Sequence, residues 1–245
     1  MNAVMQLMKD HSSVRNFSDR VIDKSLLDNI VQSGQAASSS SFIQAYSVIR
    51  VSDQQNRELI ANAAGGQSWI ISAAEFLLIC ADMSRIQTCC AKAGVEQLEG
   101  YAEHFIAATV DAALMAQNMM LAAESAGLGG VFIGGIRNAP EVVTECLQLP
   151  EQVYPVFGLC LGWPTDRQMV KPRLPVDVVL HQDSYQADLV DKQVDEYDEQ
   201  MQNYYSTRQS NVKTTNWSLQ TASAIQGKKR EHMLAFLQSQ GFLKR

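Results

Sequence analysis

The chain has 245 residues, is 46% hydrophobic and carries a formal net charge of −6, with a pI near 5.2. This length and apolar content are typical of one large or two small folded domains, and they exclude a largely disordered chain. The acidic balance argues against a general nucleic-acid binder, because such a protein needs a basic surface to neutralise phosphates.

The first predicted element is a short apolar-rich helix over residues 3–9, followed by Asp10 and His11. This start lacks the basic and apolar regions of a signal peptide. We also find no stretch that is long and charge-free enough to cross a bilayer. We therefore expect a cytoplasmic protein with no membrane segment.

A second helix is predicted over residues 24–36, because its apolar residues share one face and Asp23 can cap it. Four serines follow at residues 38–41 and lead to a strand at residues 47–51. A run of serines is usually a flexible linker. Here a helix and a strand flank it, so we expect its hydroxyls and amides to be held in place.

A third helix is predicted around residues 58–60, followed by two glycines and Gln67 and then by a buried strand at residues 76–80. A polar connector is expected as far as residue 98. The longest predicted helix covers residues 102–126 and is apolar on nearly all sides. Such a helix belongs in the centre of a large core or in a subunit interface.

Five glycines surround a short apolar strand in residues 127–137. Glycine lets the backbone approach a planar or anionic ligand closely, so this stretch can cradle a cofactor. It can equally be a helix C-cap at Gly127 and a tight strand exit at Gly134 and Gly135, with no ligand. The glycines follow a helix, whereas those of the dinucleotide-binding fingerprint follow a strand.

The remaining predicted elements are a helix near residues 139–147, a strand at 153–161, an irregular proline-containing segment at 162–175, a helix near 193–206, a loop at 207–216 and a helix from about 218 to 239. We see no repeat and no linker long enough to separate a second domain. We expect one domain over residues 1–245, with an arm from about residue 176 that wraps over the core or over a partner.

The five cysteines show no CxxC spacing, and the four histidines show no metal-binding pattern. Cys80, Cys146 and Cys160 lie in apolar runs and are expected to be small core residues. The adjacent Cys89 and Cys90 can be redox-active, but we expect a simple loop there. The sequence predicts neither a disulfide framework nor a metal site.

Four cations stand out by their setting. His11 and Arg15 can converge after the first helix, while Lys171 and Arg173 flank a proline and would point the same way in an extended segment. Together such groups can anchor a phosphate through charge-assisted hydrogen bonds. Composition alone favours the alternative, a set of solvated surface charges.

Motifs that are weak singly come in a characteristic order. They are residues 11–15, 38–44, 65–67, 127–137, 157–162 and 171–175, with Tyr204, Tyr205, Thr207 and Arg208 further on. As a set they resemble the oxygen-insensitive NADPH nitroreductases and the related NADPH:flavin reductases of bacteria. The resemblance runs from about residue 4 to the C-terminus.

The resemblance implies an α+β, nitroreductase-like fold, in which helices flank a central, mainly antiparallel sheet. It implies a homodimer with the long helices packed across the two-fold axis and one FMN per subunit at the interface. NADPH would be the co-substrate. Small nitroaromatic compounds, quinones or flavins would be the acceptors.

The resemblance also assigns residues. Those implied for FMN are His11, Ser12, Ser13, Val14, Arg15, Ser39, Ser40, Gln67, Phe132, Ile133, Gly134, Gly135, Lys171 and Arg173. Those implied for NADPH or the acceptor are Ser41, Phe42, Arg137, Arg208 and Arg230. Arg208 is the candidate for the 2′-phosphate of NADPH, and a plain loop charge is the alternative. No side chain is assigned as a catalytic acid or base.

Two positions depart from the family pattern. Ser12 stands where the family usually has arginine, which removes a cation near the phosphate. Phe132 stands where tyrosine is common, which removes a hydroxyl but keeps the packing. Neither changes the reaction class.

The reaction that the resemblance implies is a two-electron, ping-pong hydride transfer from NADPH through FMN to an acceptor. One alternative is an NADPH:FMN oxidoreductase that supplies reduced flavin. Another, of a different class, is a flavin-binding sensor or carrier with no turnover. The sequence does not identify the natural acceptor.

Overall fold

A computed structural model describes residues 2–95, 98–187, 190–208 and 212–245. The chain forms two compact units. The first, here called the sheet unit, comprises the chain up to Gln168 together with Arg230–Arg245. The second, here called the tyrosine unit, is Met169–Lys229. The single domain with a C-terminal arm stays a prediction.

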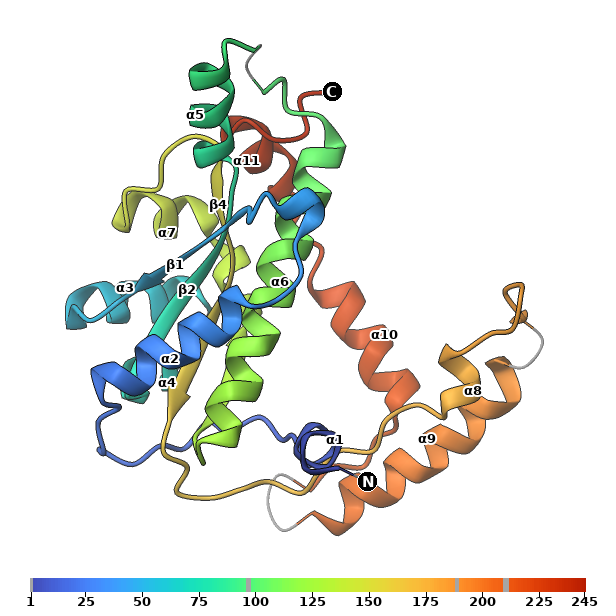
Figure 1. Cartoon of the computed structure of the whole chain (residues 1–245). Helices are drawn as coiled ribbons and strands as arrows, with labels where there is room; N and C mark the ends of the chain where they lie inside the picture. The colour runs from blue at the N-terminus through green and yellow to red at the C-terminus, as the bar shows by residue number, and fades with distance from the viewer. Residues whose placement is uncertain (1, 96–97, 188–189, 209–211) are drawn as a thin grey trace. The chain divides into compact units, whose positions relative to one another are not determined.

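The sheet unit is built on four antiparallel strands in the order β1-β2-β4-β3 (Figure 1). The strands are β1 (Tyr46–Arg50), β2 (Glu75–Asp82), β3 (Gly129–Ile133) and β4 (Val153–Gly162). These bounds confirm the four strands expected from the sequence. The two edge strands, β1 and β3, therefore lie on opposite sides of the sheet.

Strand β2 is buried on both faces, which explains its unbroken apolar run. Leu77 and Ile79 join the core that includes helices α2 and α6. Phe76 and Leu78 point to the opposite face and join the core of helices α3, α4 and α7. Because side chains alternate along a strand, a strand covered on both faces needs apolar residues at every position.

The helices of the sheet unit are α1 (Ala3–Lys9), α2 (Lys24–Gln35), α3 (Gln54–Ala63), α4 (Trp69–Ser72), α5 (Ser84–Ala93), α6 (Ala102–Ser125), α7 (Pro140–Cys146) and α11 (Met233–Ser239). The helices expected at 3–9, 24–36, 58–60, 102–126 and 139–147 are confirmed. The polar connector expected before residue 98 is wrong, because α5 occupies much of it. Cys89 and Cys90 consequently lie on a helix and not in a loop.

Helix α6 is the one helix within the described ranges whose length and composition would allow it to cross a membrane. The expectation that no stretch meets this test was therefore too strict. The helix packs against α2 and against all four strands, and it buries the carboxylate of Asp111. These contacts place one side of α6 in the core, which is one of the two positions that its all-round apolar pattern allowed.

The tyrosine unit contains α8 (Val176–Val179), α9 (Val190–Thr207) and α10 (Trp217–Gly227). Its core consists of four residues of α9, with Leu174 and Trp217 packed against them; the four are Tyr197, Met201, Tyr204 and Tyr205. The single helix expected from about 218 to 239 is wrong. The chain breaks between α10 and α11, where Arg230 has a φ of 46°.

Candidate functional site

The loop that carries His11 and Arg15 runs beside edge strand β3. The backbone N–H of Val14 donates to the carbonyl of Gly130 at 2.9 Å. A Cβ on Gly129 would lie 2.5 Å from a methyl carbon of Val14, so only glycine allows this close approach. Val14 is itself buried, and Ser12 and Ser13 beside it are half-buried.

His11 and Arg15 reach different partners from this loop. The His11 Nδ1 atom lies 2.6 Å from Oε1 of Glu124, near the C-terminal end of α6. The guanidinium of Arg15 lies over the ring of Trp69, 5.6 Å from its centroid. The indole Nε1 of Trp69 is buried and has no hydrogen-bond partner. The loop thus presents one imidazole and one guanidinium on either side of Val14.

Gln67 packs against the end of β3, where the short helix η2 (Gly134–Asn138) begins. The side-chain amide of Gln67 donates to the carbonyl of Ala64 at 2.8 Å. A Cβ on Gly135 would collide with that amide and with the Ala64 carbonyl. Gly135 is therefore packed closely against protein atoms, which agrees with the interpretation of this glycine that needs no ligand.

Two arginines flank Gly134. Arg230 donates to the Gly134 carbonyl at 3.0 Å and to Oδ1 of Asn138 at 2.9 Å. Arg137 lies against Gly134 and donates to the carbonyl of Val156. Burial and, to a smaller extent, the neighbouring Arg230 lower the pKa of Arg137. Two adjacent guanidinium groups make this end of β3 suitable for an anion.

These residues form what we call the β3-edge cluster. It consists of His11, Ser12, Ser13, Val14, Arg15, Gln67, Phe132, Ile133, Gly134, Gly135, Arg137 and Arg230. Within it Ile133 is fully buried. Phe132 is half-buried and meets Phe157 edge to face, with ring centroids 5.2 Å apart.

The serine run forms a separate structure, the Ser39–Gln44 turn, which includes the short helix η1 (Ser40–Phe42). The buried carboxylate of Asp111 accepts the N–H of Ser40 at 2.8 Å and that of Ala45 at 3.1 Å. Ser41, Phe42 and Gln44 all have positive φ values, of 46°, 59° and 53°. The turn is thus held in an unusual conformation, as expected, and the side chain of Phe42 is 81% exposed.

In a single chain the turn and the β3-edge cluster are far apart. The turn is bound to Asp111 and His11 to Glu124, and 13 residues of α6 separate these two carboxylates. At 1.5 Å per residue this is about 20 Å. The turn also precedes β1, at the opposite edge of the sheet from β3. Ser39, Ser40, Ser41 and Phe42 therefore do not join the other predicted site residues of the sheet unit.

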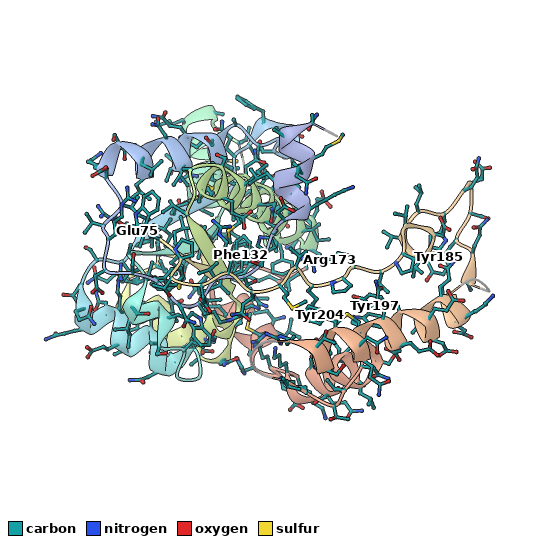
Figure 2. The ribbon with its side chains drawn as sticks, turned by 90° about the horizontal axis from the view of Figure 1, so that it is seen from below. Glu75, Phe132, Arg173, Tyr185, Tyr197 and Tyr204 are labelled. Carbon is teal, nitrogen blue, oxygen red and sulfur yellow. The ribbon has the colours of Figure 1, made fainter. Side chains whose placement is uncertain are left out.

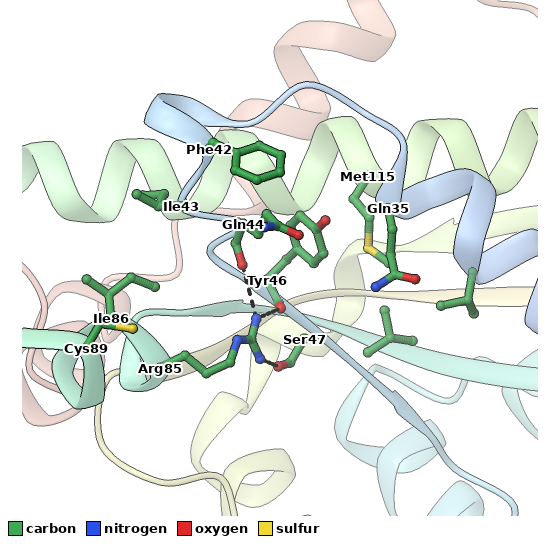
Figure 3. A pocket seen from close by; sticks show the side chains of 12 residues that line it. Gln35, Phe42, Ile43, Gln44, Tyr46, Ser47, Arg85, Ile86, Cys89 and Met115 are labelled. Carbon is green, nitrogen blue, oxygen red and sulfur yellow. Dashed lines mark hydrogen bonds between the residues drawn. The ribbon is translucent and has the colours of Figure 1, made fainter. Parts of the chain in front are cut away.

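A cavity of about 640 Å³ lies beside this turn, between α2, β1, α5 and α6 (Figure 3). Arg85 closes its floor by donating to Ser47 Oγ and to the carbonyl of Gln44. Of the residues predicted for FMN none lines it, whereas Phe42 does. Burial, and secondarily Asp111, raises the pKa of the lining residue Tyr46.

The remaining predicted cations belong to the tyrosine unit. Figure 2 shows Tyr197 and Tyr204 reaching from α9 toward the segment that carries Arg173. The Tyr197 hydroxyl donates to the Pro172 carbonyl at 2.8 Å, which holds this segment in place. The ammonium of Lys171 lies 5.3 Å from the ring centroid of Tyr205.

Arg173 and Arg208 have partners of their own in this unit. Arg173 turns back to donate to the Lys171 carbonyl at 2.8 Å. The guanidinium of Arg208 lies 5.6 Å from the ring centroid of Tyr204. Lys171 and Arg208 thus each lie against a tyrosine ring of α9, whereas Arg173 is bonded to the backbone of its own segment.

Sequence reasoning missed several residues that build the site. Asp111 and Glu124 were not among the expected site residues, yet they hold the Ser39–Gln44 turn and His11. The available signal was the presence of two carboxylates in an otherwise apolar helix. Trp69 and Asn138 gave no comparable signal.

Two of the cysteines lie in the core of the sheet unit, together with Ile133 of the β3-edge cluster. Cys80 and Cys160 are fully buried, as expected for small core residues. Burial raises the pKa of both thiols well above the usual range, so they stay protonated and unreactive. Cys146 is only half-buried.

Comparisons with known proteins agree with this architecture. Residues 8–163 match the model of the Nitroreductase family, and residues 171–245 match that of its C-terminal domain. The chain is 42% identical to an oxygen-insensitive NADPH nitroreductase of Salmonella typhimurium and 42% identical to an NADPH-flavin oxidoreductase of Vibrio harveyi. Both alignments cover 100% of each chain.

Solved structures give the same result. A nitroreductase from B. subtilis superposes with a TM-score of 0.94 at 37% identity, over 99% of this chain and 100% of the other. The NADPH:FMN oxidoreductase from Vibrio harveyi, complexed with NAD+, gives 0.90 at 40% identity over 100% of both. The family model covers more than half of the chain and the relatives match it from end to end, so this protein belongs to the nitroreductase family.

Proposed function

We propose that the protein is an FMN-dependent NADPH oxidoreductase that reduces nitroaromatic compounds and quinones in two-electron steps. The observation that carries the proposal is the β3-edge cluster, where a tightly packed, glycine-lined strand edge lies between cations at both ends. Relatives named an oxygen-insensitive NADPH nitroreductase and an NADPH-flavin oxidoreductase match the whole chain.

The residues of the cluster fit FMN. The buried Nε1–H of Trp69 lacks a partner beside Arg15, and a buried donor of this kind is costly unless a ligand or water accepts from it. Within the sheet unit, His11 and Arg15 would hold the phosphate. The roles of Lys171 and Arg173 in binding the phosphate stay predictions. When bound, FMN supplies the hydride chemistry between NADPH and the acceptor.

The protein's own contribution is positioning and charge. Where β3 ends and η2 begins, the polar side chain nearest to Gly134 is that of Arg137, and the one nearest to Gly135 is that of Gln67. Arg137 and Arg230 add positive charge there. Such fixed charge stabilises negative charge that develops during hydride transfer. No side-chain acid or base is needed.

A homodimer is part of this proposal. Ile106, Val110 and Leu114 form a stripe on α6 and are 52%, 49% and 44% exposed, and a stripe with this spacing suits helix-to-helix packing. The wide separation of the Ser39–Gln44 turn from the β3-edge cluster supports a site completed by a second copy. A Val110→Glu variant should sediment as a monomer and lose bound flavin, whereas the wild type should sediment as a dimer.

The purified protein tests the function directly. We expect a yellow protein whose flavin absorbance is bleached by NADPH under anaerobic conditions and restored by nitrofurazone or a quinone. NADH should bleach it more slowly. A yellow protein that NADPH does not bleach would favour the sensor or carrier alternative, and a colourless one that does not take up FMN would refute the proposal.

A second enzymatic function is supported by the Vibrio harveyi relative, which is named an NADPH-flavin oxidoreductase and is just as similar to this chain. In that case free FMN would be the acceptor. Steady-state rates with FMN and with nitrofurazone, measured at equal concentrations, separate the two functions. A cytoplasmic location stays a prediction.

A further inference from the structure

Glu124 is a buried carboxylate with an unusual partner. It lies in the last turn of α6, and its side chain is 7% exposed. Its Oε1 atom is 2.6 Å from Nδ1 of His11, whose side chain is 26% exposed. Removing a carboxylate from water is costly unless a hydrogen-bonded or charged partner compensates for it. His11 provides that compensation.

This contact fixes the imidazole in two respects. An ionised carboxylate only accepts hydrogen bonds, so the proton between the two groups resides on Nδ1. The other ring nitrogen, Nε2, is left for a different partner. For Nε2 to donate to a phosphate it must also carry a proton, and the ring is then an imidazolium cation flanked by two anions.

The charges around His11 agree with this arrangement. Helix α6 ends at Ser125, so its carbonyl end lies near the ring and favours a positive charge. The remaining charged groups on the neighbouring elements have other partners or point to solvent. At the end of α1, Lys9 is exposed and Asp10 accepts from Gln6.

The loop and the segment after β4 complete this list of charges. Arg15 lies over Trp69. Asp166 accepts from Asn16, and Arg167 donates to the Gly127 carbonyl. Ser12, beside the imidazole, brings a hydroxyl and no charge. Glu124 is therefore the carboxylate that governs this imidazole.

We propose that Glu124 is a positioning residue for the cofactor phosphate, which it serves by fixing the orientation and the tautomer of the His11 imidazole. The inference rests on the proposed function, because it needs FMN as the ligand. It assigns a task to a residue of the long helix whose side chain contacts His11. A substitution at residue 124 should therefore weaken the binding of the phosphate group and leave the binding of the flavin ring nearly unchanged.

The experiment compares FMN with riboflavin, which has the same ring and no phosphate. Apoprotein is titrated with each ligand at pH 7.5, and flavin fluorescence quenching gives both dissociation constants. We expect Glu124→Gln, which keeps the size of the side chain and removes its charge, to weaken FMN binding about tenfold. Riboflavin binding should change less than about twofold. Glu145→Gln, on the exposed face of α7, is the matched control.

A double-mutant cycle with His11→Gln tests whether the effect passes through the imidazole. His11→Gln should weaken FMN binding about as much as Glu124→Gln, and adding the second substitution should change little further. Glu124→Asp, which keeps the charge, should restore part of the loss. If Glu124→Gln is poorly folded, Glu124→Asp takes its place in the cycle, and His11→Gln, at a part-exposed position, still compares FMN with riboflavin.

Equal losses for FMN and riboflavin, or additive effects in the cycle, would each overturn the inference. Wild-type protein that binds neither flavin would instead overturn the proposed function.

Discussion

The β3-edge cluster and the Ser39–Gln44 turn are held in place in different ways. The cluster is fixed by many contacts from several elements, including Val14 with Gly130, Gln67 with Ala64 and Arg230 with Gly134. The turn is held by the carboxylate of Asp111 and by Arg85, which donates to the Gln44 carbonyl, and it contains three residues with positive φ. We therefore expect the β3-edge cluster to be rigid, and we expect a single substitution to be able to change the conformation of the Ser39–Gln44 turn.

The largest expected effect concerns whether one site uses the β3-edge cluster of one subunit and the Ser39–Gln44 turn of the other. Arg15→Glu should abolish activity through the cluster, and Ser40→Trp should abolish it through the turn. Mixing and reassociating the two inactive proteins should place both defects in one site of each mixed dimer and leave its other site intact. About a quarter of wild-type activity should return, because half of the dimers are mixed and each has one good site.

Nitrofurazone reduction after refolding of the mixture measures this recovery. Each variant refolded alone is the control. If the mixture stays as inactive as its components, both regions serve the same subunit's site, and the two-subunit site must be abandoned.

Loss of the turn's anchor should have the next largest effect. Asp111→Ala leaves the N–H groups of Ser40 and Ala45 without their acceptor, and we expect about 3 kcal/mol less stability toward urea, since hydrogen bonds to a charged group contribute ~1.5–3 kcal/mol each. Asp111→Asn, which keeps one acceptor oxygen, should lose about half as much. Gln117→Ala, on the exposed side of the same helix, controls for helix effects. If Asp111→Ala loses less stability toward urea than Gln117→Ala does, the turn is held by contacts other than those with Asp111.

A single methyl group tests how tightly the cluster is packed. In Gly135→Ala the new Cβ would meet the Gln67 amide and the Ala64 backbone, so we expect about 2 kcal/mol of destabilisation from overpacking together with weaker FMN retention. Gly227→Ala is the control, because no atom lies within 4 Å of its Cβ position. Thermal unfolding of both variants measures the difference. Equal melting temperatures would mean that the strand edge yields easily.

The smallest expected effect concerns the co-substrate. If Arg208 binds the 2′-phosphate, Arg208→Ala should raise the KM for NADPH about tenfold, which is the loss of one charge-assisted contact, and leave the KM for NADH nearly unchanged. Lys213→Ala, an exposed charge further along the same loop, is the control. Equal increases for both nucleotides would retire this assignment and leave Arg208 as a loop charge.

Much of the fold could be read from the sequence, because its periodicities are strong. The apolar runs of β2 and β4 and the length of α6 predicted their places closely. Helix α5 was missed because Ser84–Ala93 is mostly polar or small. The break between α10 and α11 was missed because it depends on contacts of Arg230 with Asn138 and Gly134, which sequence periodicity does not report.

The candidate site was predictable only in part. The motif order gave the family and the list of residues, but spacing along the chain could not show that the Ser39–Gln44 turn lies on the far side of the sheet from β3. Nor could it show the partners of His11 and Arg15, because Glu124 and Trp69 lie 113 and 54 residues away in the chain. Long-range packing sets these pairs.

The three tryptophans are distributed so that each can act as a separate optical probe. Trp69 lies under Arg15, Trp163 lies under Arg20 just after β4, and Trp217 packs against Tyr197 in the tyrosine unit. In a variant that keeps only Trp69, binding of FMN would be seen as energy transfer from this indole. In a variant that keeps only Trp217, unfolding of the tyrosine unit would be seen as a red shift of the tryptophan fluorescence. The protein thus contains intrinsic fluorophores for watching its parts independently, without any added label.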